Sequence, residues 1–155
     1  MKGNDKVIAA LNQALHEELT ALSQYFVHAE MRENWKYINL AKYTKKLSIV
    51  EMKHAEKLIE HILFLEGTPD MKGPAHFAIG KTVQKQFEND LKSELDAIKS
   101  YNDAVILAGE VKDFATREIL EKILKDEDRH IDQIEELQDQ ISQMSLQIFL
   151  TTQVG

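Results

Sequence analysis

Apolar residues recur every three to four positions through most of the chain, in four long stripes that are each interrupted near the middle by a polar residue. This spacing is typical of amphipathic α-helices that bury one face. The stripes run over residues 8–29, 40–58, 83–108 and 120–141. The pattern predicts an all-α protein whose main element is a four-helix bundle over about residues 5–141.

The connections between these segments predict how the helices are joined. Short breaks at 34–36 and 109–113 each link two predicted helices into a hairpin. Residues 67–81, which contain both prolines, predict a long crossover between the second and third helices. About 14 extended residues cover about 42 Å, the length of a 28-residue helix. The crossover can therefore run along the bundle and start the second hairpin at the far end.

The last residues predict a fifth, short helix. Residues 140–155 contain no charged side chain. Leu146, Ile148, Phe149 and Leu150 give the segment at about 146–152 an apolar side. We expect this helix to need burial, for which another subunit is one candidate.

Composition narrows the class of protein. With 155 residues, 43% of them hydrophobic and 29% charged, we expect one domain over 1–155. The lack of cysteine excludes disulfides, thiolate-bound clusters and cysteine nucleophiles. No apolar run suits a membrane span and the N-terminal residues do not resemble a signal peptide, so we expect a cytoplasmic protein without a membrane partner. The net charge of −7 argues against nucleic-acid binding.

One set of polar residues repeats along the chain. Two Glu-x-x-His motifs, Glu51 to His54 and Glu127 to His130, each follow a lone glutamate, Glu18 or Glu94, by 33 residues. All these positions, and Tyr25 with Tyr101, obey one period of 76 residues. A Glu and a His three residues apart lie on the same helix face. Two such helices, with two more that each give one glutamate, form the ligand set of a dinuclear carboxylate metal site.

The chemistry of the repeated residues favours metal binding. A buried glutamate can simply be paired with a Lys or Arg, but no cationic residue occupies these stripes at the same depth. Four converging carboxylates repel one another and are costly to bury. Two divalent cations balance their charge, and oxygen-rich ligation with one imidazole per ion suits iron or manganese. Either tyrosine can donate a hydrogen bond, act as a one-electron donor, or only fill space.

Several stretches closely resemble bacterioferritins, which have a ferritin-like fold. They are the opening MKGNDKVI, Ser23 to Phe26, Glu51 to Ala55, Ile62 to Gly67, Glu94 to Asp96 and Asp126 to Asp132. The resemblance implies a ferroxidase that oxidises Fe(II) with dioxygen or peroxide and stores ferric mineral in a hollow homo-oligomer of 24 subunits. It implies that Glu18 and His54 bind one iron, Glu94 and His130 the other, and that Glu51 and Glu127 bridge the pair.

The same resemblance gives Met52 a role as an axial ligand of haem b shared between two subunits, with a ferredoxin as a possible reductant. Met52 looks away from the glutamates, and Leu19, Phe26, Trp35 and Ile49 are candidates for an apolar outer surface around it. The chain departs from some family members at Lys46 and Val50, where His and Asp are associated with iron passage. An accessory inner iron site is therefore doubtful.

Other interpretations remain open. A rubrerythrin-like peroxidase shares the duplicated motif but normally carries a cysteine-bound iron module, which this chain lacks. A haem-free ferritin is a second alternative, in which Met52 does not bind haem. A substrate oxygenase needs a pocket for which the bundle leaves little room. A purely structural cage with adventitious zinc is the non-enzymatic alternative.

Overall fold

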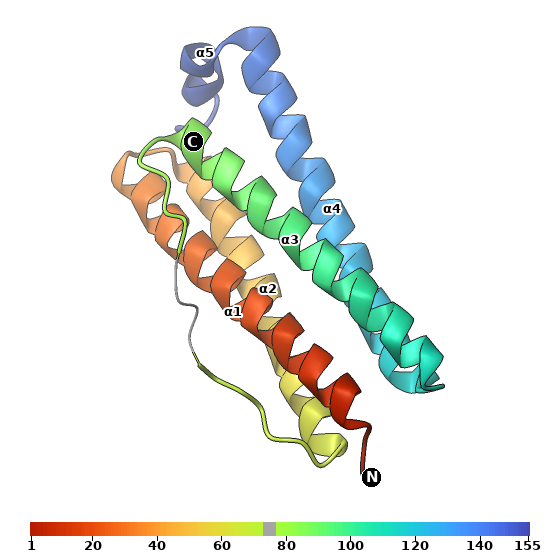
Figure 1. Cartoon of the computed structure of the whole chain (residues 1–155). Coiled ribbons are helices and arrows are strands. Elements are labelled where there is room, and N and C mark those ends of the chain that lie inside the picture. The colour runs from red at the N-terminus through yellow and green to blue at the C-terminus, as the bar shows by residue number, and fades with distance from the viewer. Residues whose placement is uncertain (73–76) are drawn as a thin grey trace.

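The computed structural model describes residues 1–72 and 77–155, and within these ranges the chain forms five α-helices (Figure 1). Their bounds are α1 Asp5–Asn34, α2 Ile38–Phe64, α3 Val83–Glu110, α4 Phe114–Met144 and α5 Leu146–Thr151. The first four lie lengthwise beside one another as a bundle, and α5 sits at one end (Figure 1). The predicted fold class is confirmed. The last bundle helix runs to Met144 rather than ending near 141.

Every helix except α2 begins at a side-chain cap, and the four long helices are each followed by a residue in the left-handed region. The Asn4 side chain accepts hydrogen bonds from the backbone of Lys6 and Val7 at the start of α1, so Asn4 is the cap. After α1, Lys36 adopts a φ of 69°, and the next residue, Tyr37, donates its backbone N–H to the Arg32 carbonyl at 2.9 Å. Such a closure satisfies the carbonyls of the last turn and reverses the chain. The same closure ends α2 and α3.

The crossover between α2 and α3 runs along α1. Near its start, the Asn12 side chain donates to the Thr68 carbonyl at 3.1 Å and accepts from the Asp70 backbone at 2.7 Å. Near its end, the Ala78 backbone donates to the Gln24 side chain at 3.2 Å. The chain thus moves along the bundle as the length argument predicts (Figure 1). Residues 73–76, including Pro74 of the predicted crossover, lie outside the described residues.

The apolar core lies in two main clusters, one toward each end of the bundle. The first includes Leu11, Leu58 and Tyr101, and the second includes Phe87 and Phe149. Phe149 of α5 is fully buried and packs edge-on against Phe87 of α3, with ring centroids 6.5 Å apart. The fifth helix therefore finds an apolar partner in its own chain. Among the described residues, no helix is both long and apolar enough to cross a membrane.

Candidate metal centre

Six buried side chains from the four long helices meet between the two apolar clusters, and we call them the glutamate–histidine centre. They are Glu18 of α1, Glu51 and His54 of α2, Glu94 of α3, and Glu127 and His130 of α4. Each is at most 6% exposed. The structure thus brings together all six residues selected by the 76-residue repeat. Each Glu-x-x-His motif places its two side chains on one helix face because three residues make nearly one turn.

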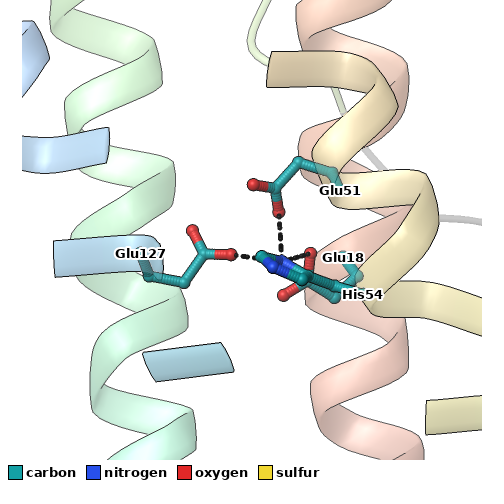
Figure 2. Close-up of side chains that lie close together, drawn as sticks. All are labelled: Glu18, Glu51, His54 and Glu127. Carbon is teal, nitrogen blue, oxygen red and sulfur yellow. Dashed lines mark hydrogen bonds and ion pairs between the residues drawn. The ribbon is translucent and has the colours of Figure 1, made fainter. Parts of the chain in front are cut away.

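The centre has two halves that share two glutamates. One oxygen or nitrogen from each of four residues lies within 4.8 Å of the others in each half. The first half is Glu18, Glu51, His54 and Glu127, drawn in Figure 2, and the second is Glu51, Glu94, Glu127 and His130. Because Glu51 and Glu127 belong to both, they have the placement required of bridging ligands.

The two imidazoles point the same nitrogen into the centre. His54 Nδ1 lies 2.9 Å from a Glu127 oxygen and 3.5 Å from a Glu18 oxygen (Figure 2). His130 Nδ1 lies 3.0 Å from a Glu51 oxygen and 3.5 Å from a Glu94 oxygen. The rings are 6.3 Å apart and close to parallel. Each half therefore has one imidazole nitrogen facing three carboxylates.

Many polar atoms of the centre lack hydrogen-bond partners, which is the feature that best fits a bound cation. In the described residues, seven buried side-chain atoms have no partner, and five of them belong to the centre. These five are Glu18 Oε2, Glu51 Oε1, Glu94 Oε2, Glu127 Oε2 and His130 Nδ1. Buried polar atoms are normally satisfied. Carboxylate oxygens without hydrogen-bond partners, converging on two points, are the type of ligand atoms that divalent metals require.

Without metal, protons carry the positive charge of the centre. Burial, and then the charge of Glu51, raise the pKa of Glu18 and of Glu94 well above the ordinary value. Burial opposes ionisation of His54 and His130, but hydrogen bonds to the surrounding carboxylates outweigh it and raise the pKa of both imidazoles to about 12. A cation that binds here must therefore displace protons.

Two tyrosines cross-link the helices at the edge of the centre. Tyr25 of α1 donates its hydroxyl to a Glu94 oxygen on α3 at 2.5 Å. Tyr101 of α3 donates in the same way to Glu18 on α1. Burial, and then the nearby carboxylates, raise the pKa of both phenols, so both remain donors. Each tyrosine donates to one oxygen of Glu94 or Glu18, and the other oxygen of that glutamate has no hydrogen-bond partner.

A second group of buried polar residues, which the sequence patterns did not reveal, lies closer to the α5 end. This second polar layer consists of Gln24, His28, Arg32, Thr44, Gln86 and Asp90. Asp90 accepts from Gln24 at 2.8 Å and from His28 at 2.9 Å. Arg32 donates to Gln86 at 2.8 Å, so a cationic side chain is buried in the bundle. It lies about four turns along α1 from Glu18 and forms no ion pair with the centre in the described chain.

Asp126 is a further residue that the sequence patterns did not single out. Its Oδ2 lies 2.9 Å from His54 Nε2, on the side of the ring that faces away from the centre. Its other oxygen accepts from Arg129. At 32% side-chain exposure, Asp126 lies at the edge of the apolar stripe, where hydrophobic periodicity gives no signal.

The outer surface near Met52 is smaller than expected. Met52 is 43% exposed, and Ile49, one turn earlier on α2, is 42% exposed. Phe26 of α1 is also exposed, at 54%. Leu19 and Trp35, expected on the same surface, instead pack partly buried against the two core clusters. Met52 thus lies on the outer surface of α2 and not in the core.

Comparisons with known proteins agree with this fold and site. The family model of the ferritin-like domain matches residues 8–144. A bacterioferritin of Mycolicibacterium paratuberculosis is 36% identical, with 96% of this chain and 94% of that one aligned. One of Mycobacterium bovis is 38% identical with 92% of each covered, and one of Rhodobacter capsulatus is 44% identical with 87% and 84% covered. The chain belongs to the bacterioferritin family of ferritin-like proteins.

Proposed function

We propose that this protein is a ferroxidase that oxidises Fe(II) at the glutamate–histidine centre and stores the product as ferric mineral. The observation that carries the proposal is the set of converging, unpartnered carboxylate oxygens. The four carboxylates match the charge of two divalent ions, and no lysine or arginine forms an ion pair with the centre in the described residues. Membership of the bacterioferritin family supports iron as the metal.

The six residues have distinct roles in this proposal. Glu18 and His54 bind one Fe(II), and Glu94 and His130 bind the other. Glu51 and Glu127 bind both. Binding displaces the protons held at the two Nδ1 atoms. Each Fe(II) gives up one electron, so one dioxygen takes two electrons and two protons to become hydrogen peroxide. With peroxide as the oxidant, the same two electrons and two protons yield two water molecules.

Fe(II) oxidation in a stopped-flow spectrometer tests the assignment. The wild-type protein should oxidise Fe(II) faster than air-saturated buffer alone, and Glu18→Ala should lose this activity. Glu88→Ala is the matched control, because Glu88 is an exposed glutamate whose one ion pair in the described residues is with Lys85 at the surface. Oxidation at an unchanged rate in Glu18→Ala would show that the centre is not the site. Metal analysis of the same samples separates a ferroxidase from a structural cage that holds zinc.

We further propose that the chain assembles with its own copies into a hollow shell, expected to contain 24 subunits, in the cytoplasm. Haem b would lie between two subunits, with the Met52 sulfur of each as an axial ligand. Haem would supply a one-electron redox centre for iron release, and a ferredoxin is the expected reductant. Met52→Leu should abolish the bis-thioether absorption spectrum of the haem-loaded protein. An unchanged spectrum would exclude Met52 as the axial ligand, and a wild-type protein that binds no haem would favour a haem-free ferritin.

The runner-up function is a rubrerythrin-like peroxidase, because it uses the same duplicated motif. Peroxide would then be consumed with a steady supply of electrons and without growth of a ferric mineral. Loading the protein with several hundred Fe(II) per shell distinguishes the two functions. An electron-dense core that sediments with the protein supports storage, and turnover of peroxide without a core supports the peroxidase.

A further inference from the structure

Two openings on the α2–α4 face lead to the two histidines of the centre. The first, of about 460 Å³, is lined by His54 and Asp126, and the second, of about 440 Å³, by His130, Val50 and again Asp126. The 76-residue repeat relates six lining positions of one opening to six of the other. The pairs are His54 with His130, Lys57 with Gln133, Ile119 with Tyr43, Lys122 with Lys46, Ile123 with Leu47, and Asp126 with Val50.

The openings differ in what contacts the outer nitrogen of each imidazole. Asp126 Oδ2 lies 2.9 Å from His54 Nε2 in the first opening. Val50, its counterpart by the repeat, has no polar side-chain atom to offer His130. Across residues 1–72 and 77–155, Nε2 of the His130 ring has no hydrogen-bond partner, whereas its Nδ1 faces the carboxylates of the centre. Both imidazoles therefore have carboxylates at Nδ1, but in the described residues only His54 also has a partner at Nε2.

A hydrogen bond on the outer nitrogen determines how an imidazole binds a metal. The Asp126 carboxylate can accept a hydrogen bond from Nε2 but cannot donate one. The tautomer with the proton on Nε2 is therefore favoured, and the lone pair stays on Nδ1, which faces the carboxylates. The same contact fixes the ring orientation and makes Nδ1 more basic. Arg129 contacts the other Asp126 oxygen and so helps to hold the aspartate in place.

We propose that Asp126 is a positioning residue that makes the two halves of the centre unequal. The half containing His54 binds the first divalent ion, and the half containing His130 binds the second ion more weakly. This inference rests on the proposed metal-binding function. Because removal of such an outer hydrogen bond typically changes metal affinity by 10–100-fold, we expect two binding steps that differ by about this factor.

Titration of the metal-free, full-length protein with Co(II), followed by visible absorption, tests the proposal. The wild type should show two steps per subunit. Asp126→Leu should weaken the first step about 10–100-fold so that the steps merge. Asp126→Asn should keep two steps, because its amide oxygen still accepts from Nε2. Val50→Asp should strengthen the second step, because it supplies the missing partner of His130.

Crystals soaked with one equivalent of Co(II) per subunit locate the first ion by anomalous scattering. The wild type should show the stronger peak beside His54, and Asp126→Leu should show two peaks of similar height. A loss of packing alone would not move the metal between halves. Two equal steps in the wild type, or unchanged constants and peaks in Asp126→Leu, would overturn the inequality and leave the ferroxidase proposal standing. A wild-type protein that binds no Co(II) would overturn both.

Discussion

The glutamate–histidine centre and the second polar layer are both buried in the bundle, but they are built in opposite ways. In the second polar layer, Asp90 receives two hydrogen bonds from side chains of its own layer, and the Arg32 cation is buried with it. In the glutamate–histidine centre, four acidic side chains converge with two imidazoles and leave four carboxylate oxygens unpartnered. The hydrogen bonds of the second polar layer are nearly all made within the protein, whereas the carboxylates of the centre need a bound cation.

This difference separates a structural polar cluster from a ligand set better than burial or charge does. The layer also binds the crossover, because Gly80 donates its backbone N–H to His28 Nε2 at 3.0 Å. A Cβ at Gly80 would lie only 2.4 Å from the Gln86 backbone nitrogen, so this position requires glycine. These contacts of His28, Gly80 and Gln86 stabilise the fold. The comparison therefore predicts that metal affects one region and that loss of internal partners affects the other.

The largest expected effect is the stabilisation of the wild-type protein by metal. At about 1,000 times the dissociation constant, a bound ion adds about 4 kcal/mol to the free energy of unfolding, or roughly 8–16 °C in Tm. Calorimetry of metal-free and Co(II)-loaded protein measures this shift. Glu127→Ala should lose most of it, because Glu127 belongs to both halves. Asp90→Asn should keep it, and its loss in that variant would show that metal binding also depends on the second polar layer.

Asp90→Ala should destabilise the metal-free protein by about 3 kcal/mol, because Gln24 and His28 lose their acceptor and each unsatisfied buried group costs about 1–3 kcal/mol. Urea unfolding followed by circular dichroism measures the change. Asp103→Ala is the control on the same helix, since Asp103 is exposed and, within residues 1–72 and 77–155, forms its one ion pair with Lys99. This variant should stay within about 0.5 kcal/mol of wild type. Equal effects of the two substitutions would show that the layer contributes little.

Metal affinity should fall as the pH falls. The pKa of His54 and of His130 is about 12 in the metal-free protein, so both imidazoles are protonated at neutral pH and must lose a proton when a cation binds. Binding of two ions should release at least two protons, and the overall constant should fall about 100-fold per pH unit. Calorimetric titrations in buffers of different ionisation enthalpy count the protons. Binding without proton release would contradict the arrangement of charge in the centre.

The smallest expected effect is that of the tyrosines on metal affinity. Tyr101→Phe removes the donor to Glu18, and Tyr25→Phe removes the donor to Glu94. Loss of one hydrogen bond to a carboxylate is worth about 1.5–3 kcal/mol at most, and relaxation of the glutamate toward the ion offsets part of this loss. We expect a several-fold weaker Co(II) constant in each variant. A constant that matches wild type would assign both tyrosines to packing.

The fold and the set of converging residues were predictable because both depend on periodicity. The heptad-like stripes predicted the four long helices, and the 76-residue repeat selected the six residues that the structure brings together. Their assignment as iron ligands stays a prediction. Asp126 and Arg32 were not predicted, because neither is an apolar position of a stripe or a member of the repeated set. Their contacts to His54 and to Gln86 come from other helices. For Asp126, the sequence offered one indication: the position related to it by the repeat is Val50, so the two halves differ there.

The burial of the fifth helix against its own chain was also beyond the sequence pattern. An uncharged segment indicates that a surface must be covered, but it does not identify the surface. Phe149 packs against Phe87 because α4 ends near α3 and the chain turns at Ser145, which has a φ of 75°. Helix lengths and turn geometry decide such a contact together.

The internal repeat suggests how the halves of the centre came to differ. A single helical hairpin with one Glu and one Glu-x-x-His would already complete the set of six by pairing with its own copy about a two-fold axis. In such an ancestor every substitution would appear twice. Joining two copies through the crossover ends that constraint, so that an aspartate can be retained at one position while its equivalent becomes valine. Fusion of the hairpins thus allows a symmetric cluster to evolve ordered occupancy.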